Sequence, residues 1–516
     1  MSDAAWWRTG AVYQIYPRSF QDSTGNGIGD LPGLRSRLDW VEQLGVSAVW
    51  LSPVHPSPQA DFGYDVADYC DVDPIFGSLA DMDQLIHDCH ARGLKVVLDG
   101  VFNHTSDQHA WFTASRADKT NAKRDWYIWR DTVPNNWKST FGGTAWTQDP
   151  ATGSYYLHSF LPAQPDLNWR NPDVVDAVLD VLRFWFERGV DGFRLDVFNS
   201  YLKHPDLPSN PRRWHPGALA YGYVGQHHIH DRDQSDLPEV LGRMRAVADE
   251  FGAVLIGETL DEKFRYDRAA DFVGDDQLHM AFHFALLHSR WTAKKLATAI
   301  RSQLNALPKD GWPTWVLSNH DFQRHPTRWG GGDERAKAAA VIALTLPGTP
   351  FLYYGEELGM AEGRLKRADI VDPPGIRFWP VFKGRDGART PMQWTSEGAF
   401  TTGIPWLPLN PDTPWRHAEA TANPLSIVHT YRALLALRRN NEALRSGATI
   451  WPDTDHADVL SWQRVVASER VRVLVNTVDR SVLVPGEAGT QVLWSTAAVT
   501  DVREPLAPNE GRVVRV

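Results

Sequence analysis

Four short apolar runs of the chain end in acidic, histidine or arginine residues, the residue types that acid–base chemistry and metal binding require. The first run ends with Asp99 and His104, the second with Arg194 and Asp196, the third with Glu258, and the fourth with His320 and Asp321. Each of them alone is typical of a cap, a turn or a scaffold residue. Their recurrence at equivalent places in successive runs predicts one shared site.

Three carboxylates in one pocket suit the cleavage of a glycosidic bond. One attacks the anomeric carbon, a second protonates the departing oxygen, and a third helps to stabilise the transition state. Arg194 lies two residues before Asp196, so in a strand the two side chains point the same way. The guanidinium then favours the ionised carboxylate that a nucleophile needs. Glu258 leaves the apolar run 254–256, where burial raises a carboxyl pKa, and therefore suits the acid.

The competing chemistry is that of a metal-dependent hydrolase. His104 and His320 could join several aspartates as ligands of Zn²⁺ or Mn²⁺, but such a site needs a dedicated cluster of ligands. Arg194 beside the carboxylate argues against a cation there, so we expect no cofactor for catalysis.

The elements that must position these residues repeat one unit, which is an amphipathic helix, a glycine and a short apolar strand. Apolar residues three and four apart mark the helices, and Gly45, Gly93, Gly189 and Gly252 end them. One helix opens with Asn171 and Pro172, a typical N-cap and first-turn pair. The predicted strands cover residues 11–16, 46–51, 94–98, 190–195, 253–257, about 280–284, 314–317 and 349–353.

These runs are short and continuously apolar, which is typical of parallel strands buried on both faces. About eight of them predict an α/β fold of the (β/α)8 TIM-barrel type, in which catalytic groups lie at the C-terminal ends of the strands. A doubly wound open sheet is the alternative, but the glycine-rich phosphate loop that it would carry after an early strand is absent.

Two segments break the barrel rhythm and indicate further domains. Residues 105–175 are rich in Trp, Asn, Asp and Gly and are too long for a simple loop, so we expect a small domain inserted after strand three. From about residue 446 short β-prone runs predict a C-terminal antiparallel β-domain. The predicted domains are therefore 1–104 with 176–445, 105–175, and 446–516, and residues 427–444 form a last barrel helix.

Composition restricts the partners and the location. The 53 basic and 63 acidic residues give a formal net charge of −10, which argues against a nucleic-acid backbone or an anionic membrane as the main partner. Cys70 and Cys89 are the only cysteines, too few for a disulfide framework or a four-cysteine zinc site. The first ten residues do not read as a signal peptide, and no apolar stretch reaches membrane-spanning length. We expect a cytoplasmic protein, monomer or homodimer.

At these residues the sequence strongly resembles the α-amylase family of glycoside hydrolases, and within it the α-glucosidase and oligo-1,6-glucosidase subgroup. The matching stretches are 12–17, 99–104, 164–168, 192–196, 256–258 and 318–321, in the family's order. The resemblance implies Asp196 as nucleophile, Glu258 as acid/base and Asp321 as the residue that grips the distorted sugar. It also implies that His104, Arg194 and His320 line the subsite for the non-reducing glucose, and it implies the same three-part architecture.

Three further stretches resemble the subgroup. In 61–65, Tyr64 would stack on glucose and Asp65 would hold its outer hydroxyls, and in 385–394, Arg389 would pair with Asp65 and close the pocket behind one glucose. An ordinary rim salt bridge is the alternative for this pair. Residues 22–30 resemble a loop that holds structural Ca²⁺ or Mg²⁺, here through Asp22, Thr24, Asn26, Ile28 and Asp30. A turn held by Asx hydrogen bonds is the alternative for this loop.

The leading hypothesis is a retaining exo-acting α-glucosidase that hydrolyses terminal non-reducing α-glucosyl units of short oligosaccharides through a covalent glucosyl-enzyme intermediate. The alternative within the family is a glucosyltransferase or isomerase that passes the glucosyl group to a sugar or alcohol. A catalytically dead barrel that serves as a binding subunit is disfavoured, because all three carboxylates are retained.

Overall fold

The computed structural model describes residues 5–218, 222–260, 266–420, 423–452, 456–484 and 490–516. Residues 1–4, which the predicted barrel domain includes, lie outside the described residues. The described α-helices are α1 (Trp6–Thr9), α2 (Leu31–Arg35), α3 (Leu38–Leu44), α4 (Leu79–Ala91), α5 (Ala110–Ala117), α6 (Pro172–Glu187), α8 (Leu237–Glu250), α9 (Ala285–His288), α10 (Ala293–Ala306), α11 (His325–Trp329), α12 (Gly332–Thr345), α13 (Pro373–Phe378), α14 (Ile427–Asn440) and α15 (Glu442–Ser446). None of these helices is long and apolar enough to cross a membrane.

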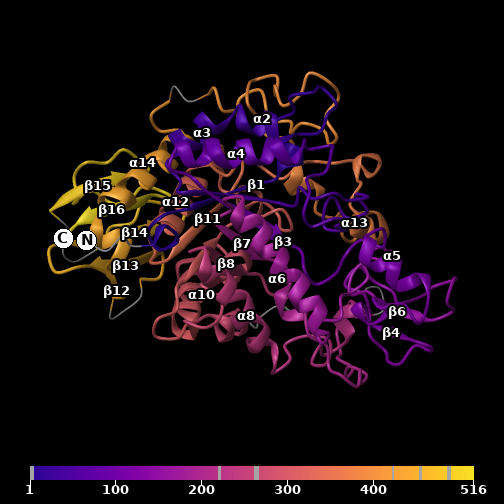
Figure 1. The fold of residues 1–516 in the computed structure, drawn as a ribbon. Coiled ribbons are helices and arrows are strands. Elements are labelled where there is room, and N and C mark those ends of the chain that lie inside the picture. The colour runs from indigo at the N-terminus through magenta and orange to yellow at the C-terminus, as the bar shows by residue number, and fades with distance from the viewer. Residues whose placement is uncertain (1–4, 219–221, 261–265, 421–422, 453–455, 485–489) are drawn as a thin grey trace.

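A sheet of eight parallel strands forms the centre of the molecule (Figure 1) and confirms the predicted barrel. Its strands run in the order β10, β11, β1, β2, β3, β7, β8 and β9. Their bounds are β1 (Val12–Ile15), β2 (Ala48–Leu51), β3 (Lys95–Gly100), β7 (Gly192–Leu195), β8 (Val254–Gly257), β9 (Met280–Ala281), β10 (Thr314–Val316) and β11 (Thr349–Tyr353). Between the first and last strands of this order, the Thr314 hydroxyl donates to the Ala281 carbonyl at 2.9 Å. The barrel is therefore nearly closed.

The helix signals in the sequence act as predicted. Asn171 caps α6 by accepting from the Asp173 backbone N–H, Pro172 occupies the first helical position, and Gly189 follows with φ of 97°. The predicted last helix differs, because it is two helices. The Asn441 side chain accepts from Leu444 N at 2.9 Å and starts α15 directly after α14.

The inside of the barrel is a packed core rather than a channel. Apolar side chains from successive strands meet there, among them Val12, Ala48, Trp50, Val97, Ile256, Val316 and Phe351. The Arg194 guanidinium lies over the Trp50 ring, 5.3 Å from its centroid. This core is thus the floor beneath the C-terminal ends of the strands.

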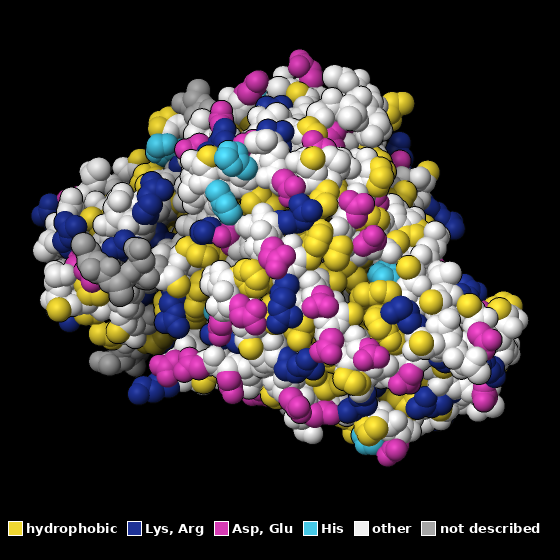
Figure 2. Space-filling model, viewed as in Figure 1, with side chains coloured by type: hydrophobic (Ala, Val, Ile, Leu, Met, Phe, Trp, Pro, Cys, Tyr) yellow, Lys and Arg dark blue, Asp and Glu magenta, His cyan; other side chains and the backbone are white. Residues whose placement is uncertain are grey.

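Two smaller sheets flank the barrel at opposite ends of the molecule (Figure 1). Within the predicted insertion, β4 (Trp129–Arg130), β5 (Trp146–Gln148) and β6 (Tyr155–Leu157) form an antiparallel sheet. At the C-terminal end, the strands β12 (Ala448–Ile450), β13 (Val459–Val465), β14 (Arg470–Asn476), β15 (Gln491–Ser495) and β16 (Gly511–Arg515) form a five-stranded antiparallel sheet. The antiparallel C-terminal β-domain is confirmed. On the face seen in Figure 2, acidic and basic side chains are interspersed.

Candidate active site

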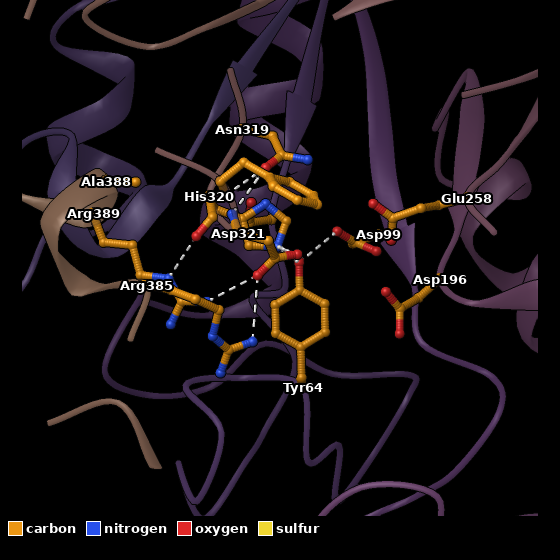
Figure 3. Close-up of polar contacts among 12 residues, drawn as sticks. Tyr64, Asp99, Asp196, Glu258, Asn319, His320, Asp321, Arg385, Ala388 and Arg389 are labelled. Atoms are coloured by element: carbon orange, nitrogen blue, oxygen red, sulfur yellow. Dashed lines mark hydrogen bonds and ion pairs between the residues drawn. The ribbon is translucent and has the colours of Figure 1, made fainter. Parts of the chain in front are cut away.

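The three predicted catalytic carboxylates open into one cavity of about 330 Å³ at the C-terminal ends of the strands. Leu195 of β7 pairs with Gly257 of β8, and Asp196 and Glu258 are the next residues along each strand, at equal depth. Asp321 follows β10 and faces them from the opposite side (Figure 3). The sheet register therefore brings together acids that are far apart in the sequence.

Arg194 joins the acidic residues of the site. Its Nη1 donates to Asp196 Oδ1 and to Asp99 Oδ1, both at 2.6 Å, and its Nη2 donates to Glu258. The expectation that its guanidinium lies beside Asp196 is confirmed. The side chain is fully buried, so the single positive charge is shared by three carboxylates away from water.

Burial and neighbouring charge give the acids different protonation. Burial raises the pKa of Glu258 well above its usual value. The negative charges of Asp196 and Asp321 add to this effect, and Arg194 opposes it. Burial likewise raises the pKa of Asp99 to about 7. Burial also disfavours the ionised form of Asp321, but its neighbours His320, Arg385 and Arg389 outweigh burial and lower its pKa. Among the predicted catalytic acids, Glu258 is thus the one prepared to carry a proton.

Tyr64 and His104 line the inner end of the cavity, whereas His320 and Arg194, which were also expected to line it, lie just outside the lining. The Tyr64 hydroxyl lies 2.6 Å from His320 Nε2 and 3.1 Å from Asp99 Oδ2, and the two rings are stacked with centroids 5.4 Å apart. Burial lowers the pKa of His320 to about 3, so this ring is neutral at ordinary pH. His104 Nε2 lies 2.9 Å from the Tyr64 carbonyl and 3.1 Å from Gln164 Nε2. These contacts fix the orientation of both predicted histidines.

The predicted pair between Asp65 and Arg389 is wrong. Asp65 is fully buried outside the cavity lining, where its carboxylate accepts from Ser57 Oγ and from the backbone N–H groups of residues 60 and 61. Arg389 is also buried behind the cavity, where it donates to the His320 carbonyl at 2.9 Å and to Asp321 at 3.2 Å. Both residues support the site from behind.

The pair at the inner end of the cavity is Asp61 with Arg385, from the same two sequence segments. Arg385 Nη2 lies 2.6 Å from Asp61 Oδ1, Nη1 lies 3.3 Å from Asp321 Oδ1, and both paired acids line the cavity. Asp372 holds Arg385 in this position through bonds to Nε at 2.9 Å, to Nη2 at 2.6 Å and to the backbone N–H at 2.9 Å. The ring of Phe141 covers the guanidinium, with its centroid 5.2 Å away.

Comparisons with known proteins agree with this arrangement. The model of the α-amylase catalytic domain matches residues 14–447. The chain belongs to the α-amylase family. A probable α-glucosidase of Rhizobium meliloti is 46% identical, covering 93% of this chain and 90% of the relative. An oligo-1,6-glucosidase of Heyndrickxia coagulans is 38% identical, covering 92% and 93%.

Solved structures of family members superpose over nearly the whole chain. The α-glucosyl transfer enzyme XgtA is 40% identical with a TM-score of 0.93, covering 99% of this chain and 100% of that one. The trehalulose synthase MutB from Pseudomonas mesoacidophila is 33% identical with a TM-score of 0.89, covering 99% of each chain. The protein is therefore an α-amylase-family glycoside hydrolase by descent.

Lys203 is a buried residue near the cavity that the sequence analysis did not single out. Its side chain is almost fully buried. The ammonium lies 2.9 Å from Asn103 Oδ1 and 3.0 Å from Asp166 Oδ2, and it also donates to the Ser200 carbonyl. These partners come from the segments after β3 and β7 and from the inserted segment. The ammonium thus ties the insertion to the barrel beside His104, at a position where no motif indicates a site.

The loop proposed to hold Ca²⁺ or Mg²⁺ has its side-chain oxygens engaged in hydrogen bonds. Asp22 accepts from the backbone N–H groups of residues 24, 25 and 27 and from Thr401 Oγ1. Asn26 Oδ1 accepts from Ile28 N at 2.8 Å, and Asp30 caps α2. These contacts fit a turn held by Asx hydrogen bonds, so metal binding here stays a prediction. Across the described residues, no group of three or more His, Cys, Asp or Glu side chains is arranged to hold a metal ion.

Proposed function

We propose that the protein is a retaining, exo-acting α-glucosidase that removes terminal non-reducing α-glucosyl units from short oligosaccharides. The observation that carries this proposal is the Arg194 guanidinium, whose two terminal nitrogens bind Asp196 and Glu258. Carboxyl groups on one such fork lie close together. This fits the ~5–5.5 Å separation of retaining enzymes better than the ~6.5–9.5 Å that an inverting enzyme needs for its water.

In the first step Asp196 attacks the anomeric carbon while Glu258 gives its proton to the departing glycosidic oxygen. The bond to the leaving group breaks, and the glucosyl group becomes an ester of Asp196. This ester has lost the negative charge that, after burial, contributes to the raised pKa of Glu258. Glu258 can then hold no proton and act as the base that takes one from the incoming water. Asp321, kept ionised by its neighbours, lies across the cavity from Asp196 and Glu258, where it would contact the opposite side of the sugar.

The one-unit-at-a-time action follows from the inner end of the cavity. Arg385 joins Asp61 and Asp321 across this end, and Phe141 covers the guanidinium. A chain extended beyond the non-reducing glucose would have to displace this network of buried ion pairs, which costs several kcal/mol. The pocket thus fits one terminal glucose.

The test measures turnover and the anomer first released, on maltose, isomaltose, sucrose, trehalose and kojibiose. Asp196→Ala, Glu258→Gln and Asp321→Asn each lower turnover by orders of magnitude and leave the fold intact. The matched control is Asp180→Asn, since that carboxylate is 79% exposed on α6. Near-normal activity of any of the three variants contradicts its assignment, and β-glucose as the first product contradicts retention.

A glucosyltransferase or isomerase is the second candidate, because solved relatives include an α-glucosyl transfer enzyme and a trehalulose synthase. The first half-reaction is the same, and a sugar or alcohol replaces water in the second. Product analysis at high acceptor concentration separates the two activities. The cytoplasmic location and the oligomeric state stay predictions.

A further inference from the structure

Gln14 is a buried polar side chain in β1, a strand whose other residues are apolar or aromatic. It lies outside the cavity lining, so it does not itself meet a sugar in the cavity. Its Nε2 lies 2.8 Å from His320 Nδ1 and 3.3 Å from Ser52 Oγ. An amide NH2 carries two hydrogens, and here each has a neighbour that can accept it. The strand thus directs a buried donor at a histidine beside the active site.

The His320 ring is enclosed by aromatic side chains. The rings of Tyr64 and Tyr16 lie nearly parallel to it, with centroids 5.4 and 6.1 Å away, and Trp50 meets it edge-on at 6.3 Å. Burial lowers the pKa of His320 to about 3, so the neutral ring carries a single N–H. Ring contacts do not select the nitrogen that holds this hydrogen. The hydrogen-bond partners of the two nitrogens decide it.

The partners on the Nε2 side favour a hydrogen there. Nε2 lies 2.6 Å from Tyr64 Oη and 3.2 Å from Asp321 Oδ2, and the Tyr64 hydroxyl lies 3.1 Å from Asp99 Oδ2 (Figure 3). With the hydrogen on Nε2, the ring turns an N–H toward the Asp321 carboxylate, and Tyr64 keeps its own hydrogen for Asp99. With the hydrogen on Nδ1, a lone pair faces the Asp321 carboxylate, and Tyr64 has to donate to Nε2.

The same arrangement leaves Nδ1 of His320 as a buried lone pair that needs a donor. A buried acceptor without a partner destabilises the form of the ring that contains it. The Gln14 amide supplies the missing donor at 2.8 Å, and Ser52 Oγ accepts its second hydrogen. The bond at Nδ1 therefore stabilises the ring form whose hydrogen is on Nε2.

We propose that Gln14 is a positioning residue of the active site, which acts through His320 by holding its hydrogen on Nε2, toward Tyr64 and Asp321. Tyr64 and Asp321 both line the cavity, whereas Gln14 and His320 stand behind them. One amide in the first strand of the barrel thus determines how the polar groups at the inner end of the cavity share their hydrogens.

The position of this hydrogen reaches the reacting groups through further bonds. Arg194 Nη1 joins Asp99 to Asp196, at 2.6 Å from each, and the bond from Tyr64 lowers the pKa of Asp99. If Tyr64 donated to the ring instead, Asp99 would bind a proton more readily. A neutral Asp99 leaves more of the Arg194 charge to Asp196 and makes this nucleophile less reactive. The effect on turnover rests on the proposed function, whereas the position of the hydrogen does not.

The first test is nitrogen NMR of the whole protein labelled with 15N-histidine, at pH 8, which is above the pKa of about 7 of Asp99. The shifts of the two ring nitrogens distinguish a protonated nitrogen from a bare one. The His320 signals are those that disappear in His320→Asn. We expect a protonated Nε2 and a bare, hydrogen-bonded Nδ1 in the wild type. A protonated Nδ1 in the wild type overturns the inference.

The second test changes the donor at Nδ1. Gln14→Met removes it, and we expect kcat for p-nitrophenyl α-glucoside to fall by about tenfold, with KM changed by about twofold or less. Gln14→Glu keeps the size of the side chain and places a carboxylate at Nδ1, which holds a proton on the nitrogen that it faces. We expect Nδ1 to be protonated in this variant and kcat to fall by about 100-fold. Gln14→Met keeps the test decisive if the buried charge prevents folding.

Gln303→Met is the matched control, because Gln303 is 2% exposed and donates to the Thr314 carbonyl at 2.7 Å, at the start of β10, away from the site. It loses a buried amide bond of the same kind and keeps the wild-type His320 signals and kcat. A kcat of Gln14→Met equal to that of this control, or a bare Nδ1 in Gln14→Glu, overturns the inference. Absence of nitrophenol release in the wild type contradicts the proposed function, while a protonated Nε2 in the same sample still supports the role of Gln14.

Discussion

Asp372 offers the sharpest test of how the glucose pocket is held, because it lies outside the cavity lining and acts on it through Arg385, which it binds directly, with Arg389 at 3.8 Å. Its carboxylate is fully buried and accepts three bonds from Arg385, two from the guanidinium and one from the backbone. In Asp372→Asn the negative charge is lost, and either orientation of the amide turns an NH2 group toward one of these donors. Arg385 keeps Asp61 and Asp321, so the chain still folds.

The magnitude follows from the bonds that are lost. A hydrogen bond to a charged group contributes about 1.5–3 kcal/mol, and about 1.36 kcal/mol is a factor of ten, so kcat/KM for p-nitrophenyl α-glucoside falls roughly tenfold to 150-fold. Under the proposed function, Arg385 binds the sugar equally in the ground state and in the transition state. The loss therefore appears as a higher KM, with kcat changed by about twofold or less.

Steady-state kinetics on purified variants measure both constants, with circular dichroism to verify the fold. Asp369→Asn is the matched control, since that carboxylate lies in the same segment and caps a short turn by accepting from Lys366 N. A kcat/KM of Asp372→Asn equal to that of the control refutes the role of Asp372. A fall in kcat at constant KM refutes the argument that Arg385 acts by uniform binding.

Three further results are expected. Glu258 must be protonated to act as the acid, so activity falls as pH rises through its raised pKa, and Glu258→Gln removes this alkaline limb from the residual rate. Lys203→Met leaves Asp166 buried without its cation and lowers the free energy of unfolding by about 3–5 kcal/mol. The midpoint of thermal inactivation falls while the helical circular dichroism signal is retained. An unchanged midpoint contradicts the proposed tie between the insertion and the barrel. Burial raises the pKa of Glu356 to about 8, so the folded state binds this proton more tightly than the unfolded chain does. As pH rises from about 4.5 to 8, this group therefore lowers the free energy of unfolding by about 1.4 kcal/mol per pH unit. In denaturant titrations Glu356→Gln, which keeps an acceptor for Tyr431, removes this contribution from a slope that Asp99, Glu258 and other buried acids share.

Much of the scaffold could be predicted from the sequence because its signals are local. A glycine after a periodic helix and a continuously apolar run after the glycine fix where each strand begins, and the structure has its parallel strands within or next to the predicted runs. The ends of those strands then share one mouth by the geometry of the barrel. Asp196, Glu258 and Asp321 are found in this way because each follows a strand.

The choice between Asp61 and Asp65 could not be made in that way, because it depends on a turn. Phe62 and Gly63 between them have φ of 50° and 102°, and this reversal sends Asp61 into the cavity and Asp65 away from it. The partner is likewise Arg385 rather than the arginine four residues later, because the 3-10 turn that carries Arg389 points it behind His320. Strand periodicity gives no information about side-chain direction in such segments.

The segment from Asp372 to Asp386 has two parts with different roles. The residues at its two ends bind each other and hold Arg385 at the inner end of the cavity. Residues 376–383, between these ends, contribute Phe382 to the cavity lining. Gly384 must stay, because a Cβ there would lie 2.5 Å from the Asp372 carboxylate. Exchange of residues 376–383 for other sequences of equal length therefore changes the part of the cavity lining that Phe382 forms and leaves the contacts between Asp372 and Arg385 intact.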